Sequence, residues 1–324
     1  MKSFTRILAA LLAAIYLAAS PVAYAQAYPT KPIRMIVPYP PGGIDPYARV
    51  MMPAMNEFLG QPIVLENRPG ANGIIGSEIV ARSAPDGYTI LFGTSSTLVG
   101  GIFLIKDVPF DPVKDLTPIS NMFEPLQVLA APASFAPNTV KELLDYAKRN
   151  PGKISYGSSG IGSVFHLNGE LLKIVAEIDM VHIPYKGTGP LATELLAGRV
   201  DVAFPALSNV RGFLASGKVK LLAVPESKRL TQLPDVPTVA ETLPAFQKVP
   251  SWIAMFGPAG LSRPVVNRLH DAIVRGLSSP ESRKYHDDNG SQIMATGPEQ
   301  LAAALKGDLE RVGRLIKRLD IKPE

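Results

Sequence analysis

The sequence predicts an α/β protein made of two lobes. Short apolar strands alternate with amphipathic helices, an order typical of α/β proteins with mainly parallel sheets. The alternation runs in two successive series, and a chain of 324 residues is long enough for two domains of ordinary size. Each series also contains a glycine-rich turn that leads into a helix. We therefore expect two lobes that close on one ligand.

The first series begins directly after residue 32. Its strands are predicted at Ile33–Val37, Ile63–Glu66, Thr89–Phe92 and Leu116–Met122. Between them, apolar spacing predicts helices over about Asp45–Leu59 and Ile74–Arg82. Asp45 is followed by Pro46, which is the pattern of an N-cap and a first helical turn.

The second series begins near residue 126. Its strands are predicted at Leu126–Ala131, Val181–Ile183, Val202–Phe204 and Lys220–Val224. Its helices are predicted from an Asn138 or Thr139 cap to Arg149 and at Val164–Val175, Pro190–Ala197, Asn209–Ser216 and Val239–Leu243. A strand at Trp252–Phe256 and helices near Ser262, Pro280 and Pro298 follow. The pattern leaves open whether these last helices complete the second lobe or return to the first.

Residues 1–25 have the layout of a secretory signal peptide. Lys2 and Arg6 precede an apolar run, and the segment ends in Ala23-Tyr24-Ala25. The run is shorter than the roughly 20 residues of a membrane span. The sequence has no cysteine, which excludes lipid attachment at an N-terminal cysteine, disulfides and thiolate metal sites. We expect a cleaved, periplasmic protein that begins near Gln26, with an uncleaved anchor as the alternative.

Composition argues against nucleic-acid binding and gives little support for catalysis. The formal charge is +5, of which Lys2 and Arg6 supply two. No basic stripe with interleaved aromatic residues appears. The sequence has no Walker motif, no H-E-x-x-H and no G-x-S-x-G, and its four histidines lack local metal-ligand spacing. We expect neither a cofactor nor a metal.

The two glycine turns predict anion sites. The first spans residues 38–43 and the second residues 156–163, and each follows an apolar strand. A glycine turn that opens a helix exposes unpaired backbone N–H groups at the positive end of the helix dipole. Such an end binds anions. The alternative is that each turn is only a tight connection.

Several polar side chains lie near these turns. Thr94 and Ser95 end a predicted strand, where ligands of parallel sheets bind, although hydroxyls there also cap helices. The serines of the second turn have the same two interpretations. In the turn 184–190, Lys186 can offer a charge and Tyr185 can pack on a ligand. His166 can reach the cleft, or it is a buried, hydrogen-bonded histidine.

Together and in order, these motifs resemble those of Bug-type periplasmic receptors, the solute-binding components of tripartite tricarboxylate transporters. The resemblance covers essentially the whole mature chain and rests on residues 36–43, 66–73, 84–89, 110–116, 156–160 and 182–187. It implies a Venus-flytrap fold with two crossings between lobes. Lobe 1 would comprise residues 26–125 and 251–324, and lobe 2 residues 126–250. It also implies a monomer that captures a small organic carboxylate for membrane transporter subunits.

The resemblance also implies which groups hold the carboxylate. In lobe 1 they are Tyr39, Pro41, Gly42 and Gly43, with Thr94 and Ser95 nearby; in lobe 2 they are Ser158, Ser159, Gly162 and Ser163, with Tyr185 and Lys186 beside them. One departure is that Ile44 alone separates Gly43 from Asp45, where family members commonly have two residues. This shorter turn predicts a different carboxylate position or a more apolar ligand.

Two alternative functions stay open. The same ligand capture can serve a membrane sensor in place of a transporter. A protein of a different class, a secreted hydrolase or transferase, would use Ser158, Ser159 or Ser163 as a nucleophile with His166 as the base. The absence of a nucleophile-elbow motif argues against this second alternative.

Overall fold

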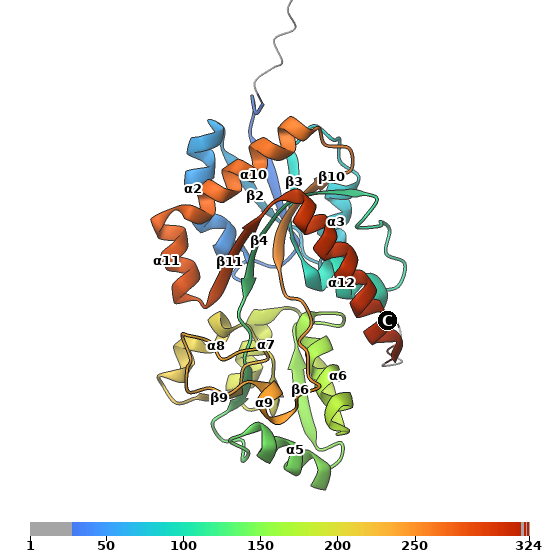
Figure 1. The fold of residues 1–324 in the computed structure, drawn as a ribbon, viewed down its shortest axis with the longest axis vertical. Coiled ribbons are helices and arrows are strands. Elements are labelled where there is room, and N and C mark those ends of the chain that lie inside the picture. Colours follow the sequence, from blue (N-terminus) through green and yellow to red (C-terminus); the bar gives the residue numbers. More distant parts are fainter. Residues whose placement is uncertain (1–27, 319–320, 322, 324) are drawn as a thin grey trace, which may run out of the picture.

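The computed structural model describes residues 28–318, 321 and 323. It has two lobes joined by two crossings of the chain (Figure 1). The predicted signal peptide, residues 1–25, lies outside the described residues. Within them, no helix has the length and apolar character that crossing a membrane requires. The predicted limits of the lobes, at 125/126 and 250/251, stay predictions.

Lobe 1 contains a six-stranded sheet in the order β11-β4-β10-β3-β1-β2. The strands are β1 (Ile33–Val37), β2 (Ile63–Asn67), β3 (Thr89–Thr94), β4 (Leu116–Pro125), β10 (Ile253–Pro258) and β11 (Ser291–Thr296). One face packs against α2 (Asp45–Leu59), α10 (Arg263–Ser278) and α11 (Pro280–Asp288). The other face carries η1 (Ala71–Gly73), α3 (Ile74–Ala81), the π-helix η2 (Ser96–Gly101), α4 (Ile102–Leu104) and α12 (Pro298–Arg318). The C-terminal helices therefore return to lobe 1.

Lobe 2 contains a five-stranded sheet in the order β7-β6-β8-β5-β9. The strands are β5 (Leu129–Pro132), β6 (Ile154–Ser158), β7 (Met180–Pro184), β8 (Val202–Ala203) and β9 (Val219–Ala223). Its helices are α5 (Val140–Arg149), α6 (Val164–Ala176), α7 (Thr188–Leu196), α8 (Leu207–Leu214) and α9 (Val239–Thr242). Two apolar clusters, one on each side of the sheet, hold these helices in place.

The prediction of mainly parallel sheets is wrong. β10 lies antiparallel between β3 and β4, and β5 lies antiparallel between β8 and β9. The cause is the path of the chain. β3 and β4 run toward the junction of the lobes, whereas β10 enters its sheet from that junction and therefore runs the opposite way. β5 enters lobe 2 in the same manner after the first crossing.

Some local predictions also need correction. The prediction omitted η2, α4 and β11, and it placed Tyr156–Ser158 in the second turn although these residues end β6. Thr139, one of the two candidates, caps α5 through Glu142 N at 3.1 Å. Asp45 is not the N-cap of α2, because Ile44 holds that position. The Asp45 carboxylate instead accepts from the backbone N–H of Gly42 at 2.6 Å.

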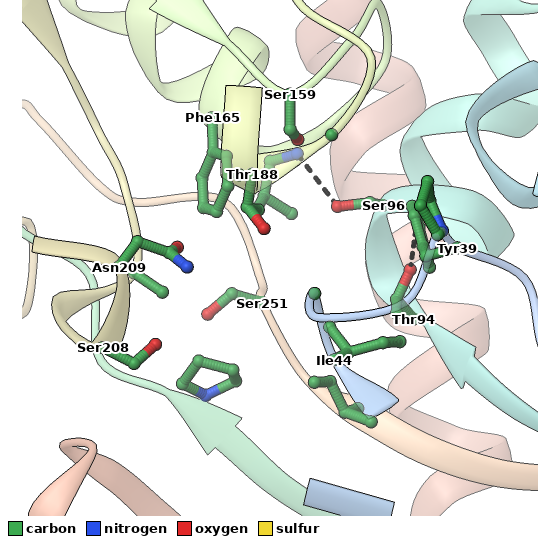
Figure 2. Close-up of a pocket in the computed structure, with 18 of the residues that line it drawn as sticks. Tyr39, Ile44, Thr94, Ser96, Ser159, Phe165, Thr188, Ser208, Asn209 and Ser251 are labelled. Carbon is green, nitrogen blue, oxygen red and sulfur yellow. Dashed lines mark hydrogen bonds between the residues drawn. The ribbon is translucent and has the colours of Figure 1, made fainter. Parts of the chain in front are cut away.

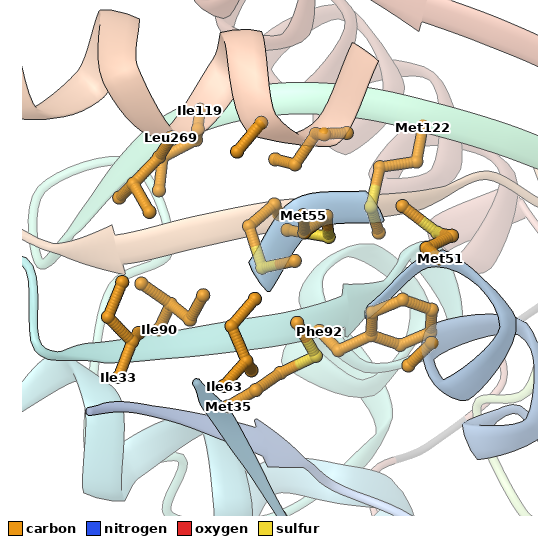
Figure 3. Close-up of a cluster of buried hydrophobic side chains, with 14 of the residues drawn as sticks. Ile33, Met35, Met51, Met55, Ile63, Ile90, Phe92, Ile119, Met122 and Leu269 are labelled. Atoms are coloured by element: carbon orange, nitrogen blue, oxygen red, sulfur yellow. The ribbon is translucent and has the colours of Figure 1, made fainter. Parts of the chain in front are cut away.

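The main core of lobe 1 fixes the strand ends that face lobe 2. Figure 3 shows methionines from β1, α2 and β4 gathered around Phe92 of β3, with branched side chains from the neighbouring strands and α10. Met35, Met51 and Met55 are each at most 1% exposed. Burial of each such side chain stabilises the fold by about 1.5–3 kcal/mol. The turn between β1 and α2 therefore starts from a rigid base.

In lobe 2, Gly169 lets α6 approach β6. A Cβ at this position would overlap the ring of Tyr156, which is fully buried. We expect Gly169→Ala to destabilise the protein by about 1–3 kcal/mol, the usual cost of overpacking. Gly307→Ala is the matched control, because Gly307 also lies inside a helix but faces open space. It should stabilise by about 0.5–1 kcal/mol. Urea denaturation that shifts both variants in the same direction would contradict this packing argument.

Candidate functional site

A cavity of about 310 Å³ lies between the lobes. Lobe 1 contributes the turn 39–44, the end of β3 at residues 94–96, and residues 251–253 after the second crossing. Lobe 2 contributes Ser159, Phe165, the turn 186–190 and the start of α8. Figure 2 shows Ser159 and Thr188 of lobe 2 facing Ser96 of lobe 1 across this space. The cavity is therefore built from both lobes.

Several helices begin at the wall of the cavity. The N-caps of α2, α7 and α8 are Ile44, Gly187 and Ala206, and none of the three caps through its side chain. All three residues line the cavity. The leading N–H groups of a helix carry partial positive charge. Three such ends from both lobes produce a positive potential in one small space.

The charged side chains agree with this polarity. Among the described residues that line the cavity, Lys186 is the one charged side chain, and none is acidic. Asp45, directly behind the first turn, is buried and bonded to Gly42 N and to Arg49 Nε at 3.1 Å. Its charge is thus compensated locally. The cavity suits an anion held by neutral donors and helix ends.

A hydrogen-bond network orients the lobe 1 wall. The Tyr39 hydroxyl lies 3.0 Å from Thr94 Oγ1 and 2.8 Å from Thr97 Oγ1, and Asn67 Nδ2 donates to Tyr39 O at 2.9 Å. Thr97 in turn donates to Asn72 O at 2.7 Å. Burial raises the pKa of Tyr39, so its hydroxyl keeps its proton. The network fixes Thr94 at the cavity.

Two contacts connect the cavity to the closure of the lobes. Val164 N, in the first turn of α6, donates to Ser96 Oγ of lobe 1 at 3.2 Å (Figure 2). Ser95 Oγ donates to Pro250 O at 2.9 Å, and Ser95 N donates to Trp252 O at 3.0 Å. Ser95 is therefore bound to the second crossing. These bonds hold the cavity walls in register.

The structure brings together eight of the thirteen residues predicted from sequence. The eight that line the cavity are Tyr39, Pro41, Gly42, Gly43, Thr94, Ser95, Ser159 and Lys186. The N–H of Gly42 is already bonded to Asp45, which leaves Gly43 as the freer of the two glycines. The role of each residue in ligand binding stays a prediction.

The other five, Ser158, Gly162, Ser163, His166 and Tyr185, lie behind the wall. Ser163 Oγ caps α6 by accepting from His166 N at 3.2 Å, and Ser158 Oγ lies 2.7 Å from His182 Nε2. Gly162 N donates to His166 Nδ1 at 3.2 Å, and a Cβ at Gly100 of lobe 1 would overlap the Gly162 carbonyl oxygen. Tyr185 packs against the lobe 2 apolar cluster. These five residues shape the second turn.

Sequence reasoning missed other lining residues: Gln127, Phe165, Ser208, Asn209 and Ser251. Thr188 lies within the turn 184–190 but was not singled out. Ser208 and Asn209 follow β8 at the start of α8, so the rule that ligands bind beyond strand ends would have found them. No local pattern marks Gln127 or Ser251, because their position depends on the two crossings.

Residues 47–321 match the family model described as the tripartite tricarboxylate transporter family receptor. The chain belongs to this family. Its relatives include protein BugT of Bordetella pertussis (strain Tohama I), which is 34% identical over 307 residues and is covered, like this chain, over 94% of its length. The predicted resemblance to Bug-type receptors is confirmed. The receptor therefore belongs to a family of periplasmic solute-binding proteins.

Two solved structures from Rhodopseudomonas palustris resemble the receptor over their full lengths. MatC, solved with bound malate, has a TM-score of 0.83 and 32% identity, covering 89% of this chain and 100% of MatC. Rpa4515, solved with adipate, has a TM-score of 0.86 and 28% identity, covering 92% of this chain and 100% of Rpa4515. The predicted two-lobe binding-protein fold is confirmed.

A histidine pair lies behind the second turn of the receptor. The rings of His166 and His182 stack at 4.2 Å, and His182 also stacks on Tyr156 at 4.8 Å. Burial lowers the pKa of His166 to about 4 and that of His182 to about 3, with the charge on Lys173 adding to both shifts. Both rings are therefore neutral at pH 7.

This pair predicts a loss of stability between pH 7 and pH 5. In the unfolded chain these two histidines bind a proton near pH 6.5, whereas in the folded chain they do so only below about pH 4. The free energy of unfolding therefore falls as the pH drops. Each histidine should cost about 2 kcal/mol by pH 5. Carboxylates such as Glu66, with a pKa of about 2, lose their contribution only below pH 4.5. Urea denaturation should show a smaller pH effect in His166→Gln; an equal effect would contradict the assignment.

The Tyr39 network predicts a second effect. Tyr39→Phe removes the hydroxyl that bonds Thr94 and Thr97, while Thr97 keeps its bond to Asn72 O. We expect a loss of about 1 kcal/mol in the free energy of unfolding, the usual value of one buried hydrogen bond. Tyr146→Phe, in α5 far from the cavity, is the control and should change little. Equal urea midpoints for the parent protein, Tyr39→Phe and Tyr146→Phe would contradict the role of this network in stability.

Proposed function

We propose that the receptor captures a small organic carboxylate between its lobes and delivers it to the membrane subunits of a tripartite transporter. It acts in the periplasm as a monomer, after cleavage of the signal peptide, and without catalysis. One observation carries the proposal: helix N-termini from both lobes, none capped through its side chain, converge on a cavity whose described lining has no acidic residue.

In this proposal the carboxylate is held where the turn 38–43 of lobe 1 faces the turn 184–190 of lobe 2. A Cβ at Gly43 would lie 3.8 Å from Thr188 Oγ1, so these turns approach across the lobes. Thr94, fixed by Tyr39, and Ser159 add hydroxyls on the two sides. Hydrogen bonds to a carboxylate are stronger than neutral ones, and closure strengthens them by excluding water.

The relatives solved with malate and adipate support this ligand class, because both compounds are small carboxylates. The surroundings of Ser158 and His166 do not support a hydrolase that uses this pair. Ser158 is buried behind the cavity wall, and its hydroxyl is bonded to His182 and the Gly160 backbone. His166, proposed as a base in the alternative mechanism, accepts from Gly162 N. A nucleophile has to reach the substrate, and Ser158 does not line the cavity.

Thermal unfolding of the mature receptor, refolded to remove carried-over ligand, tests the proposal. A panel of monocarboxylates, dicarboxylates, tricarboxylates, amino acids and uncharged amides and alcohols is added in turn. A ligand at 100 times its dissociation constant should stabilise the receptor by about 2.7 kcal/mol. We expect such a shift with carboxylates alone, and NMR should recover the compound unchanged. Chemical turnover of the bound compound, or stabilisation by the uncharged compounds alone, would contradict the proposal.

A matched pair of variants locates the carboxylate. Thr188→Val removes the hydroxyl that faces Gly43 and should weaken carboxylate binding about tenfold. Thr193→Val, later on α7 and exposed, makes the same chemical change away from the cavity and should leave the affinity unchanged. Titration calorimetry that gives both variants the same affinity would exclude Thr188 from the site.

A further inference from the structure

Gln127 is a buried polar side chain at the wall of the cavity, directly after the first crossing. It is 1% exposed, and it lines the cavity. Its Nε2 has no hydrogen-bond partner among the described residues. A buried amide nitrogen without a partner costs about 1–3 kcal/mol of stability. Such a group therefore points to a ligand atom that completes it.

The orientation of this amide is fixed by the backbone. Val249 N donates to Asn168 Oδ1 at 2.9 Å, so the other end of the Asn168 amide is Nδ2. That nitrogen donates to Gln127 Oε1 at 2.7 Å. A backbone N–H can only donate, so the chain of bonds has one direction. The unpaired end of the Gln127 amide, at the wall of the cavity, is therefore an N–H donor and not an oxygen.

None of the described residues that line this side of the cavity is charged. Glu226 lies beside the Gln127 backbone, but it does not line the cavity and is paired with Lys248, which also binds Glu124. Figure 2 shows Ser208 and Asn209 grouped on the opposite side of the cavity from Tyr39 and Thr94. Asn209 Oδ1 is buried and also has no hydrogen-bond partner in the described part of the chain. An isolated β-bridge pairs Gln127 with Ala206, which directly precedes the start of α8, and so brings Gln127 close to Ser208 and Asn209. We call Gln127, Ser208 and Asn209 together the polar end of the cavity.

The polar end has no charged side chain, whereas the other end, where the turns 38–43 and 184–190 face each other, has Lys186. Lys186 belongs to the turn of α7, where Gly187 N donates to Ser159 O at 3.2 Å. At the start of α8, Leu207 N and Asn209 N donate to Leu126 O and Ala206 O, much as Tyr47 N donates to Ile44 O at the start of α2, so the difference between the two ends lies in Lys186. A second carboxylate buried here would lack a cation, which is costly.

We propose that Gln127 determines specificity by donating a hydrogen bond to an uncharged oxygen, a hydroxyl or a carbonyl, at the far end of the ligand. The receptor then selects monocarboxylates with a neutral polar end over plain monocarboxylates and over dicarboxylates. This inference rests on the proposed function, because it requires the carboxylate to sit between the turns 38–43 and 184–190.

Two matched series test the selection by titration calorimetry. The four-carbon series is butyrate, 4-hydroxybutyrate, succinamate and succinate; the six-carbon series is hexanoate, 6-hydroxyhexanoate, adipamate and adipate. In at least one series, the hydroxy or amide compound should bind at least tenfold more tightly than the plain acid and the dicarboxylate. If a dicarboxylate or a plain acid binds as tightly as the neutral polar compounds, the inference is overturned while the proposed function stands. If no compound binds, the proposed function fails with it.

Variants at Gln127 identify the donor. Gln127→Met should weaken binding of the preferred compound about tenfold and change binding of the plain acid less than twofold. Gln127→Glu keeps the shape and the bond from Asn168 but places an oxygen toward the cavity, so it should show the same selective loss even if the Met variant folds poorly. Gln292→Met, exposed on β11, is the control and should match the parent protein. Equal losses for all ligands, or none, would overturn the role of Gln127.

Discussion

The site depends on a close approach of backbone between the two lobes. Gly100 of η2 lies against the carbonyl of Gly162 with no room for a side chain, and Ser96 Oγ accepts from Val164 N beside it. Because these contacts involve glycine and a short hydroxyl side chain, the starts of α2 and α7 come near enough to share one small ligand. A larger residue at Gly100 would separate the donors of one lobe from those of the other.

The crossings of the chain are part of the same arrangement. Lys248, next to the second crossing, binds Glu124 at 2.9 Å and Glu226 at 2.6 Å, and Ser251 Oγ also donates to Glu124 at 2.7 Å. The three charged side chains are partly buried, and removing one of them would leave a partly desolvated charge without its partner, so this cluster ties both crossings together. Val249 in the same segment sets the direction of the Asn168 and Gln127 amides. The hinge therefore positions a cavity side chain as well as joining the lobes.

Local sequence pattern was sufficient for the features that depend on neighbouring residues. The strand and helix on either side of the turn 38–43 agree with the structure, as does Thr139, one of the two candidate caps of α5. Pattern alone left open to which lobe the C-terminal helices belong. The sequence pattern did not predict features that depend on contacts between distant segments of the chain. The antiparallel insertion of β10 follows from the second crossing, and Ser158 is turned to His182, 24 residues away. Gln127 acquires its orientation from Asn168 and Val249, which no spacing rule connects.

The separation of the two ends of the cavity has a consequence for release of the ligand. In the proposed mode of binding, helix ends and hydroxyls from both lobes hold the carboxylate, and the described lining has no arginine clamp. Opening at the hinge removes the donors of one lobe and readmits water, so much of the affinity disappears without any change in charge. Gln127 stays with lobe 2 in this motion, bonded to Asn168 on α6. If both proposals hold, one group of residues selects the ligand and another retains it, so the receptor can be specific and still release its ligand when it opens.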